Sequence, residues 1–248
     1  MPSTTLPASL LDALSRAHPS WQSLLRQGLA AIDPDYLAAL AASDYLPTEQ
    51  RLFAAFSLPL PDVRYVLVGE GPYPRADSAT GVCFMDGAVG SLWSEGGLSK
   101  PVNKATSLRN FMKMLLVADG KLDLADTGGA AIAARACSAG AIQTLAQLQD
   151  KLIGQGFLLL NASLVFRPDV APAIDARAWL PFLQTVLAAL HETRPTLVLW
   201  GKIAEQLQKL PETAGLPQIV SEHPYNLSFI GHREMQALFG PMQLLHAR

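Results

Sequence analysis

Residues 65–73 read Tyr-Val-Leu-Val-Gly-Glu-Gly-Pro-Tyr, a run of four mainly apolar residues that a Gly- and Pro-rich turn follows at once. Such a short run, apolar nearly throughout, is typical of a strand that is covered on both faces of a sheet. Three further runs share this character, at 157–160, 197–200 and 219–221. The chain is therefore expected to contain four buried parallel strands.

Helical patterns separate these runs, at 107–117, 139–153, 176–190 and 202–210. Strands that alternate with helices indicate an α/β layered fold. We therefore expect a single domain with a central, mostly parallel four-stranded sheet and helices on both faces.

The N-terminal part of the chain has helix-like spacing at 10–29 and a helix start at Asp33-Pro34, with Asp33 as N-cap. A second start signal, at 47–50, leads into 51–56. We expect one domain over 1–248, made of an N-terminal helical segment (1–44) and a core (45–240). Two segments rich in small residues, 85–105 and 118–139, are expected to be surface insertions.

Composition restricts the class of protein. The chain has 248 residues, of which 50% are hydrophobic and only 16% charged, so it can bury a sizeable core and is not a disordered tail. Its net charge is −2, which argues against indiscriminate coating of nucleic acid because phosphate neutralisation needs clustered Lys and Arg. A compact DNA enzyme with one local basic patch remains compatible with these totals.

The chain has two cysteines, Cys83 and Cys137. Two thiols cannot form a four-cysteine zinc or iron–sulfur site, so no metal and no cofactor are expected. One disulfide is possible, but two reduced core thiols are favoured. The start of the chain lacks the pattern of a signal peptide, and no apolar run approaches the roughly 20 residues that span a bilayer. We expect a cytoplasmic protein with no membrane partner, and a monomer.

Polar residues follow the expected strands at the point where each one ends. Glu70 and Tyr73 follow the first strand, Asn161 the second, and His223 the fourth. Ligands of such sheets bind beyond the carboxyl ends of the strands. The pattern therefore predicts that these four side chains converge on one site.

Six fragments, in this order, carry a resemblance to a known family. They are 45–56, the stretch from Gly69 through Phe84, Ser-Leu-Arg-Asn at 107–110, 156–161, Leu-Trp-Gly at 199–201, and His-Pro-Tyr-Asn-Leu-Ser at 223–228. Together they resemble the uracil-DNA glycosylases, which show Gly-Gln-Asp-Pro-Tyr-His, Ala-His-Gly-Leu-Cys-Phe and His-Pro-Ser-Pro-Leu-Ser at matching offsets. The resemblance covers about 45–239, and it implies an enzyme of base-excision repair that removes uracil from DNA after flipping the base into a pocket.

The resemblance implies a role for each matching residue in the base pocket. Phe84 would stack on the flipped uracil, Asn161 would read its edge, and Tyr73 would exclude thymine by crowding C5. His223 would bond the uracil carbonyl as charge builds there, and the loop with Gly69 would line the pocket. The alternatives are an ordinary core Phe, a turn-forming Asn, a packing Tyr and a capping His.

The same resemblance implies contacts with the DNA itself. Leu227 would wedge into the space that the base leaves, although it could also simply cover Phe229. Ser107 and Ser228 would bind phosphates through hydroxyl and backbone N–H groups. For Ser107, plain N-capping of a helix is an equally good interpretation.

The chain departs from the family at the catalytic position. Gly71 stands where the family has its catalytic Asp, and Pro74 replaces a His. A second branch of the superfamily has Gly-Glu-Gly-Pro or Gly-Glu-Ala-Pro in this loop, with the Glu in the catalytic role, but that branch binds an iron–sulfur cluster. We therefore hypothesise that Glu70 supplies the negative charge, although it could instead bond only loop amides; Asp77 is a weaker candidate.

Two functions of different classes fit these residues. One is an active glycosylase for uracil or a related deaminated base. The other is a catalytically silent paralogue that binds DNA or a protein partner, which Gly71 and Pro74 favour. A hydrolase of another nucleobase conjugate is a third, weaker possibility. The retained pocket residues favour the enzyme, because a silent binder has less need of a base pocket.

Overall fold

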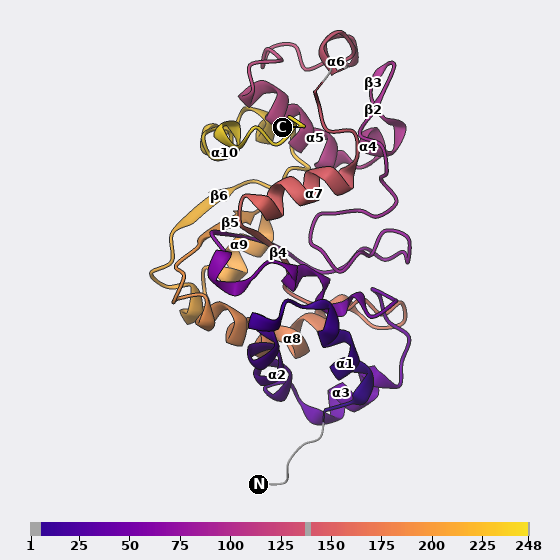
Figure 1. Ribbon diagram of the computed structural model, residues 1–248, viewed down its shortest axis with the longest axis vertical. Helices are drawn as coiled ribbons and strands as arrows, with labels where there is room; N and C mark the ends of the chain where they lie inside the picture. Colours follow the sequence, from indigo (N-terminus) through magenta and orange to yellow (C-terminus); the bar gives the residue numbers. More distant parts are fainter. Residues whose placement is uncertain (1–5, 137–139, 248) are drawn as a thin grey trace. The chain divides into compact units, whose positions relative to one another are not determined.

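A computed structural model describes residues 6–136 and 140–247 (Figure 1). Four strands form the main sheet in the order β4–β1–β5–β6, and helices flank this sheet. The strands are β1 (Tyr65–Gly69), β4 (Phe157–Asn161), β5 (Thr196–Trp200) and β6 (Gln218–Ser221). The expected α/β fold with four parallel strands is confirmed, and each expected strand lies within one or two residues of its predicted bounds.

Backbone contacts divide the chain into two compact units, each described by itself. The first contains the residues up to Gly87, Gly156–Val198 and Ile203–Gln218; the second contains Ala88–Gln155, Leu199–Lys202 and the residues from Ile219 onward. The proposed division into a helical segment (1–44) and a core (45–240) follows different boundaries and stays a prediction.

The helices of the first unit are α1 (Ala8–Ala13), α2 (Gln22–Ala30), α3 (Pro34–Ala41), α8 (Pro172–Ala189) and α9 (Lys202–Leu207), the last starting one residue outside this unit. Helix α3 begins as expected, because the Asp33 side chain accepts hydrogen bonds from the backbone N–H groups of Asp35 and Tyr36. Residues 51–56 also turn helically, as the 3-10 helix η3 (Arg51–Ser57).

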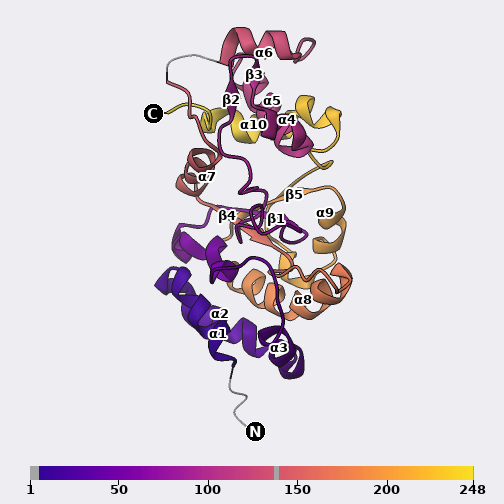
Figure 2. The same cartoon turned by 90° about the vertical axis from the view of Figure 1, so that its right-hand side faces the viewer.

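Helices α2 and α8 lie side by side (Figures 1 and 2). Buried aromatic rings pack against one another in this unit. Phe182 of α8 contacts the rings of Phe53, Phe56 and Trp179 at centroid distances of 5.2–6.2 Å. These rings form an aromatic core of the first unit, and β4 contacts η3, which carries Phe53 and Phe56.

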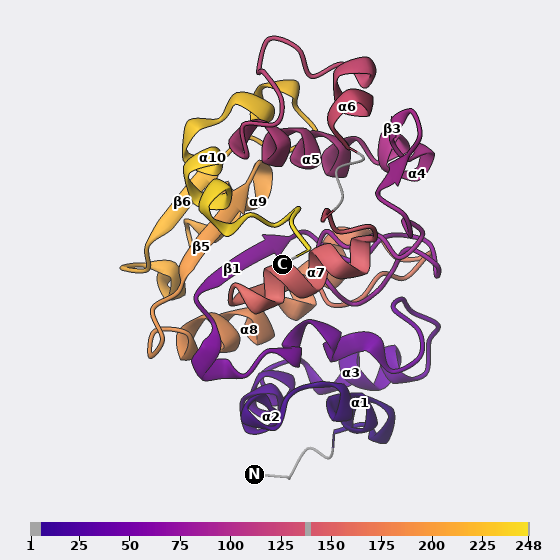
Figure 3. The same cartoon turned by 45° about the horizontal axis from the view of Figure 1, so that its top comes forward.

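The second unit contains α4 (Lys100–Lys104), α5 (Thr106–Ala118), α6 (Gly129–Ala136), α7 (Leu145–Gly154) and α10 (Arg233–Phe239), together with the hairpin β2 (Trp93–Ser94) and β3 (Gly97–Leu98). Helices α5 and α10 pack together (Figure 3). Phe111 of α5 contacts Trp200 and Phe239 at centroid distances of 5.7 and 5.1 Å, which gives this unit its own aromatic core.

The segment 85–105 is not a plain surface insertion. It folds into the β2–β3 hairpin and α4, and it buries Val89, Leu92, Leu98 and Val102. Segment 118–139 contains α6, which the sequence pattern did not indicate because Ala and Gly mask its periodicity. Helix α7 begins at Leu145 instead of 139, because Thr144 and Gln147 form a capping box there.

Candidate active site

The ends of β1 and β4 meet in the first unit. Gly69 pairs with Asn161 in the parallel register of the two strands. Beyond this pair, the Ala162 N–H donates to the Gly69 carbonyl at 2.8 Å and the Ser163 N–H donates to the Glu70 carbonyl at 3.1 Å. The two loops that follow these strands are therefore tied together, as expected for the carboxyl ends of neighbouring parallel strands.

Gly69 lies where no side chain fits. A Cβ atom at this position would lie 2.6 Å from Cys83 Sγ and 3.1 Å from Asn161 Oδ1. Cys83 is itself held by its N–H, which donates to the Leu159 carbonyl at 3.0 Å. Because Gly69 has no Cβ, its backbone can lie close to both the Cys83 thiol and the Asn161 amide.

Asn161 is 4% exposed. In the part of the chain that the structure describes, no protein group forms a hydrogen bond with its side-chain amide. Its amide atoms are not fully shut off from solvent, and they leave an acceptor oxygen and two donor hydrogens available to a ligand. The amide is therefore suited to a ligand that presents an acceptor beside a donor.

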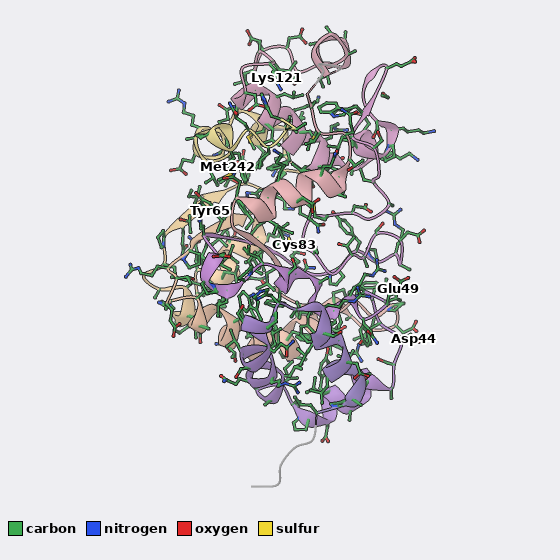
Figure 4. All side chains as sticks on the ribbon, viewed as in Figure 1. Asp44, Glu49, Tyr65, Cys83, Lys121 and Met242 are labelled. Atoms are coloured by element: carbon green, nitrogen blue, oxygen red, sulfur yellow. The ribbon has the colours of Figure 1, made fainter. Side chains whose placement is uncertain are left out.

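Tyr73 and Phe84 belong to the same neighbourhood. Burial raises the pKa of the Tyr73 phenol above its ordinary value, and nearby Cys83 and Asp86 raise it further. Burial also raises the pKa of the Cys83 thiol to about 12, although the adjoining Gly69 amide acts in the opposite direction. Cys83, labelled in Figure 4, is a free buried thiol. Cys137, the other expected core thiol, lies outside the described residues.

Phe84 has a backbone φ of 68°. A non-glycine residue in this left-handed region carries strain of about 1–2 kcal/mol, and such strain gathers at functional sites. Its ring is half-buried, so it does not behave as an ordinary core Phe. Because of this left-handed conformation, the chain turns at Phe84, directly after Cys83, and does not continue as an extended segment.

Glu70 and Gly71 are exposed and border a cavity of about 470 Å³ in the first unit. Pro72, Pro74 and Ser163 line the same cavity, and so do residues of α8 and α9. Tyr73, Phe84 and Asn161 are not among the residues that line it. A Cβ atom at Gly71 would lie 3.6 Å from the Ser163 carbonyl oxygen, which is an ordinary contact, so unlike Gly69 this position has room for a side chain.

His223 lies after β6 in the second unit, and its side chain is exposed. Its Nδ1 accepts a hydrogen bond from the Tyr225 N–H at 3.1 Å. An accepting Nδ1 cannot carry a proton, so the neutral ring carries its proton on Nε2. Gly201, at φ 65°, comes so close that a Cβ there would lie 2.8 Å from His223 Cβ.

Asn110 of α5 fastens the loop that follows His223. Its side-chain Nδ2 donates to the Pro224 carbonyl at 2.8 Å and lies 3.2 Å from the Tyr225 carbonyl. Asn110 is fully buried. In the sequence, Asn110 belongs to the fragment 107–110 but was given no role. A polar side chain among the apolar residues of one helix face is the signal that could have pointed to its contact with another part of the chain.

The other predicted DNA contacts lie on or near this loop. Leu227 is 68% exposed and Phe229, two residues later, is fully buried. Ser228 is exposed, and its hydroxyl bonds the Glu222 carboxylate; although burial acts to raise the pKa of Glu222, this bond and nearby His232 bring it below the ordinary value.

Ser107 lies in the first turn of α5, whose N-cap is Ala105. No side chain caps this end, so plain N-capping by Ser107 is wrong, and the first N–H groups of α5 have no side-chain acceptor.

Over residues 6–136 and 140–247, no three His, Cys, Asp or Glu side chains form a group that could hold a metal ion. No helix in these ranges is long and apolar enough to cross a membrane.

Comparison with known proteins gives consistent results. No family model matches the chain. A protein of Corynebacterium glutamicum named uracil-DNA glycosylase is 32% identical over 219 residues, which cover 85% of this chain and 81% of that protein. One of a Nocardioides species with the same name is 29% identical over 230 residues, covering 87% and 84%. The chain belongs to the uracil-DNA glycosylase family.

Solved structures support this membership. The crystal structure of the UNG from Nitratifractor salsuginis matches this glycosylase with a TM-score of 0.92 and 42% identity, covering 96% of this chain and 97% of that one. The mimivirus uracil-DNA glycosylase matches with a TM-score of 0.58 and 18% identity, covering 88% and 73%, and shows the shared fold alone. The resemblance found in the sequence is thereby confirmed at the level of family and fold.

Proposed function

We propose that this protein hydrolyses the N-glycosidic bond of uracil, or of a related deaminated base, in DNA, as the names of its relatives indicate. The observation that carries the proposal is the Asn161 amide, buried at the end of β4 with no protein partner among the described residues. Uracil presents an acceptor, O4, beside a donor, N3–H, and one amide can bond both. Flipping the base out of the stack brings this edge within reach of a pocket.

The pocket proposed here consists of Asn161, Tyr73 and Phe84, with the Gly69 backbone at its base. Phe84 offers a ring face for stacking. The Tyr73 phenol is half-buried in the loop after β1, and a ring in this position would exclude a methyl group at C5 by steric overlap. Apolar contact alone discriminates a methyl group by only about 1–3 kcal/mol, so a rigid wall matters for rejecting thymine.

We propose that Glu70 supplies the carboxylate of the reaction. Breaking the C1′–N1 bond leaves positive charge on the sugar and negative charge on uracil. Water then bonds to C1′ and gives up one proton, which replaces the broken bond on uracil, so the products are an abasic site and free uracil. Glu70 is the exposed carboxylate next to Gly71 at the rim of the cavity. It can orient water and offset the sugar charge, while the Nε2–H of His223 donates to the uracil carbonyl.

Leu227, Ser107 and Ser228 are proposed to hold the DNA. Leu227 has the exposure that an inserting wedge needs, and the uncapped first turn of α5 has the free N–H groups that a phosphate bonds. We further propose that the protein works in the cytoplasm as a monomer, because its DNA substrate is found there and one chain carries every residue named.

The test uses oligonucleotides with one uracil, single- and double-stranded, followed by cleavage of abasic sites with alkali. We expect strand breaks with the wild type and at least tenfold slower excision with Glu70→Gln. Asp77→Asn tests the weaker candidate, since Asp77 is also an exposed carboxylate of this segment; if Glu70 supplies the charge, Asp77→Asn should excise at the normal rate.

A double variant sharpens this test. Because Gly71 has room for a Cβ, Gly71→Asp introduced into the Glu70→Gln protein returns a carboxylate to the loop. Recovery of excision would show that negative charge in this loop drives the reaction. Full activity of Glu70→Gln alone would contradict the role of Glu70. Intact strands with retained binding of the wild type would instead support the silent DNA-binding protein that Gly71 and Pro74 favour.

A further inference from the structure

The loop after His223 carries an exposed aromatic residue to which neither the sequence nor the family comparison gives a role. Tyr225 is 66% exposed and Leu227, two residues later, is 68% exposed. Four large apolar residues are exposed over residues 6–136 and 140–247, with exposed fractions of 54–68%, and these two are the most exposed of the four. Single exposed apolar residues are ordinary, but two on one short loop indicate a surface that meets a ligand.

The Tyr225 side chain has no protein partner within the described chain. No ring contact, cation–π contact or hydrogen bond is formed by its ring or phenol among these residues. Family members have Ser at the matching place in His-Pro-Ser-Pro-Leu-Ser, a small polar residue with no stacking face. Tyr225 therefore adds an aromatic surface that packing in this chain does not require.

The backbone beneath this side chain is firmly held. The Tyr225 N–H donates to His223 Nδ1 at 3.1 Å, the Asn226 N–H donates to the His223 carbonyl at 2.9 Å, and Asn110 Nδ2 donates to the Pro224 carbonyl at 2.8 Å. Pro224, which belongs to this loop, is buried. A fixed backbone with a free side chain lowers the entropy cost of binding, because only the side-chain rotamer is ordered when the ligand arrives.

We propose that the Tyr225 ring is a stacking platform for an unpaired nucleobase of the DNA strand that Leu227 penetrates. This inference rests on the proposed function, because it needs DNA in front of the loop. Flipping uracil leaves its neighbours and its partner base without a stacking face, and an aromatic ring two residues from the wedge supplies one. Every base has a π-face, so the platform binds without sequence preference.

Nucleic acid is favoured over a protein as the occupant. The ring shares its loop with Leu227 and with the His223 that the proposed function places on the base, so whatever covers Tyr225 also lies beside the substrate. Binding to an unpaired base also predicts which substrates benefit. Single-stranded DNA and DNA with an unpaired base next to the lesion should gain more from the ring than fully paired DNA.

The experiment measures binding to an oligonucleotide that carries a tetrahydrofuran abasic analogue, so no catalysis is needed. The variants are Tyr225→Ser, which introduces the family residue, and Tyr225→Phe, which keeps the ring. Ile174→Ser is the control, because Ile174 is an exposed apolar residue of α8 at 56% exposure. Single-stranded, fully paired and single-base-bulged forms are compared, with 2-aminopurine beside the analogue to report stacking by quenched fluorescence.

We expect Tyr225→Ser to bind the single-stranded form roughly tenfold more weakly and to lose the quenching, since stacking of a base on an aromatic side chain is worth about 5- to 160-fold in affinity. Tyr225→Phe and Ile174→Ser should bind as the wild type does. Equal affinity of Tyr225→Ser and the wild type would overturn the proposal. A loss in Tyr225→Phe as large as that in Tyr225→Ser would also overturn it, because the phenol and not the ring would then be responsible.

Uracil release by the wild type is measured in parallel. If the wild type excises uracil while Tyr225→Ser binds normally, the stacking inference fails and the glycosylase function stands. If Tyr225→Ser loses binding but the wild type releases no uracil, the platform stands and the glycosylase function fails. Because Tyr225 is exposed, its replacement leaves the core intact, and unchanged melting temperatures of the variants verify this.

Discussion

The two loops that carry the main site residues are built in opposite ways. Residues 69–73 begin at the last residue of β1 and are fixed by close packing: a Cβ at Gly69 would overlap Cys83 Sγ, and Tyr73 is half-buried. Residues 223–228 follow β6 and are fixed by hydrogen bonds to their backbone, while their large side chains stay exposed. A loop that reads a base needs rigid walls, whereas a loop that enters DNA needs free side chains on a rigid backbone.

The largest effect is expected where packing fixes the first loop. In Gly69→Ala the new Cβ would overlap Cys83 Sγ at 2.6 Å and press on Asn161 Oδ1. Overpacking of this kind costs about 1–3 kcal/mol in stability. A displacement of a positioning group by about 1 Å can cost roughly a hundredfold in rate. We expect excision to fall at least about a hundredfold, measured under single-turnover conditions.

The control for this variant is Gly71→Ala, whose Cβ makes only ordinary contacts of 3.6–3.8 Å with Ser163. Its melting temperature should equal that of the wild type, whereas that of Gly69→Ala should fall. Normal excision by Gly69→Ala would show that close packing does not define the first loop, and the contrast between the loops would be lost.

A smaller effect is expected where hydrogen bonds fix the second loop. Asn110→Ala removes the donor to the buried Pro224 carbonyl, which costs about 1–3 kcal/mol. The loop backbone loosens, so DNA affinity and kcat/KM should each fall roughly tenfold. Asn103→Ala is the control, because Asn103 also donates from its side chain to a backbone carbonyl, that of Leu98, but belongs to α4. Equal losses in both variants would assign the effect to general destabilisation.

A still smaller effect is expected at Gly201, which approaches His223. Gly201→Ala combines a strained φ of 65° with a Cβ 2.8 Å from His223 Cβ. Gly215→Ala separates the two causes, because Gly215 has a φ of 78° but no atom within 4 Å of the added Cβ. Both variants should lose about 1–2 kcal/mol of stability through strain. Only Gly201→Ala should excise more slowly, by a few-fold; equal rates would show that His223 is free to shift.

The contrast between the loops also explains what the sequence could reveal. The four strands were readable because each run is apolar nearly throughout, and the turn residues that follow each strand were readable by their type. The capping box at Thr144 was equally present in the sequence, but the apolar pattern upstream of it suggested an earlier helix start. Helix α6 was hidden by a composition of Ala and Gly that carries little periodicity.

Site residues differ in the same way. Asn161 could be found because a polar residue directly after a buried strand is conspicuous. Asn110 could not be given its role, because the carbonyl it holds lies 114 positions away in the chain and nothing local signals that contact. Exposure of Tyr225 is likewise a tertiary property: the sequence shows a Tyr in a turn, and only packing shows that nothing covers it.

The smallest effect concerns Cys83, and it tests the packing of the first loop through pH. Burial raises the pKa of this thiol from 9.0 to about 12 in the folded protein. Above pH 9 the unfolded chain releases the thiol proton while the folded chain keeps it, so the folded state binds more protons and its stability falls as pH rises. The free energy of unfolding should therefore decline by up to about 1.4 kcal/mol per pH unit between about 9 and 12.

Cys83→Ala isolates this contribution from that of the buried tyrosines, whose pKa values burial also raises, so that they too lower the stability as the pH rises. Denaturant unfolding at several pH values from 8 to 11 should give a shallower decline for Cys83→Ala than for the wild type. Parallel curves for the two proteins would mean that water reaches the thiol and that the contact of Cys83 with Gly69 opens in solution. The first loop would then be held no more tightly than the second, and the proposed exclusion of thymine by Tyr73 could not rest on rigid packing.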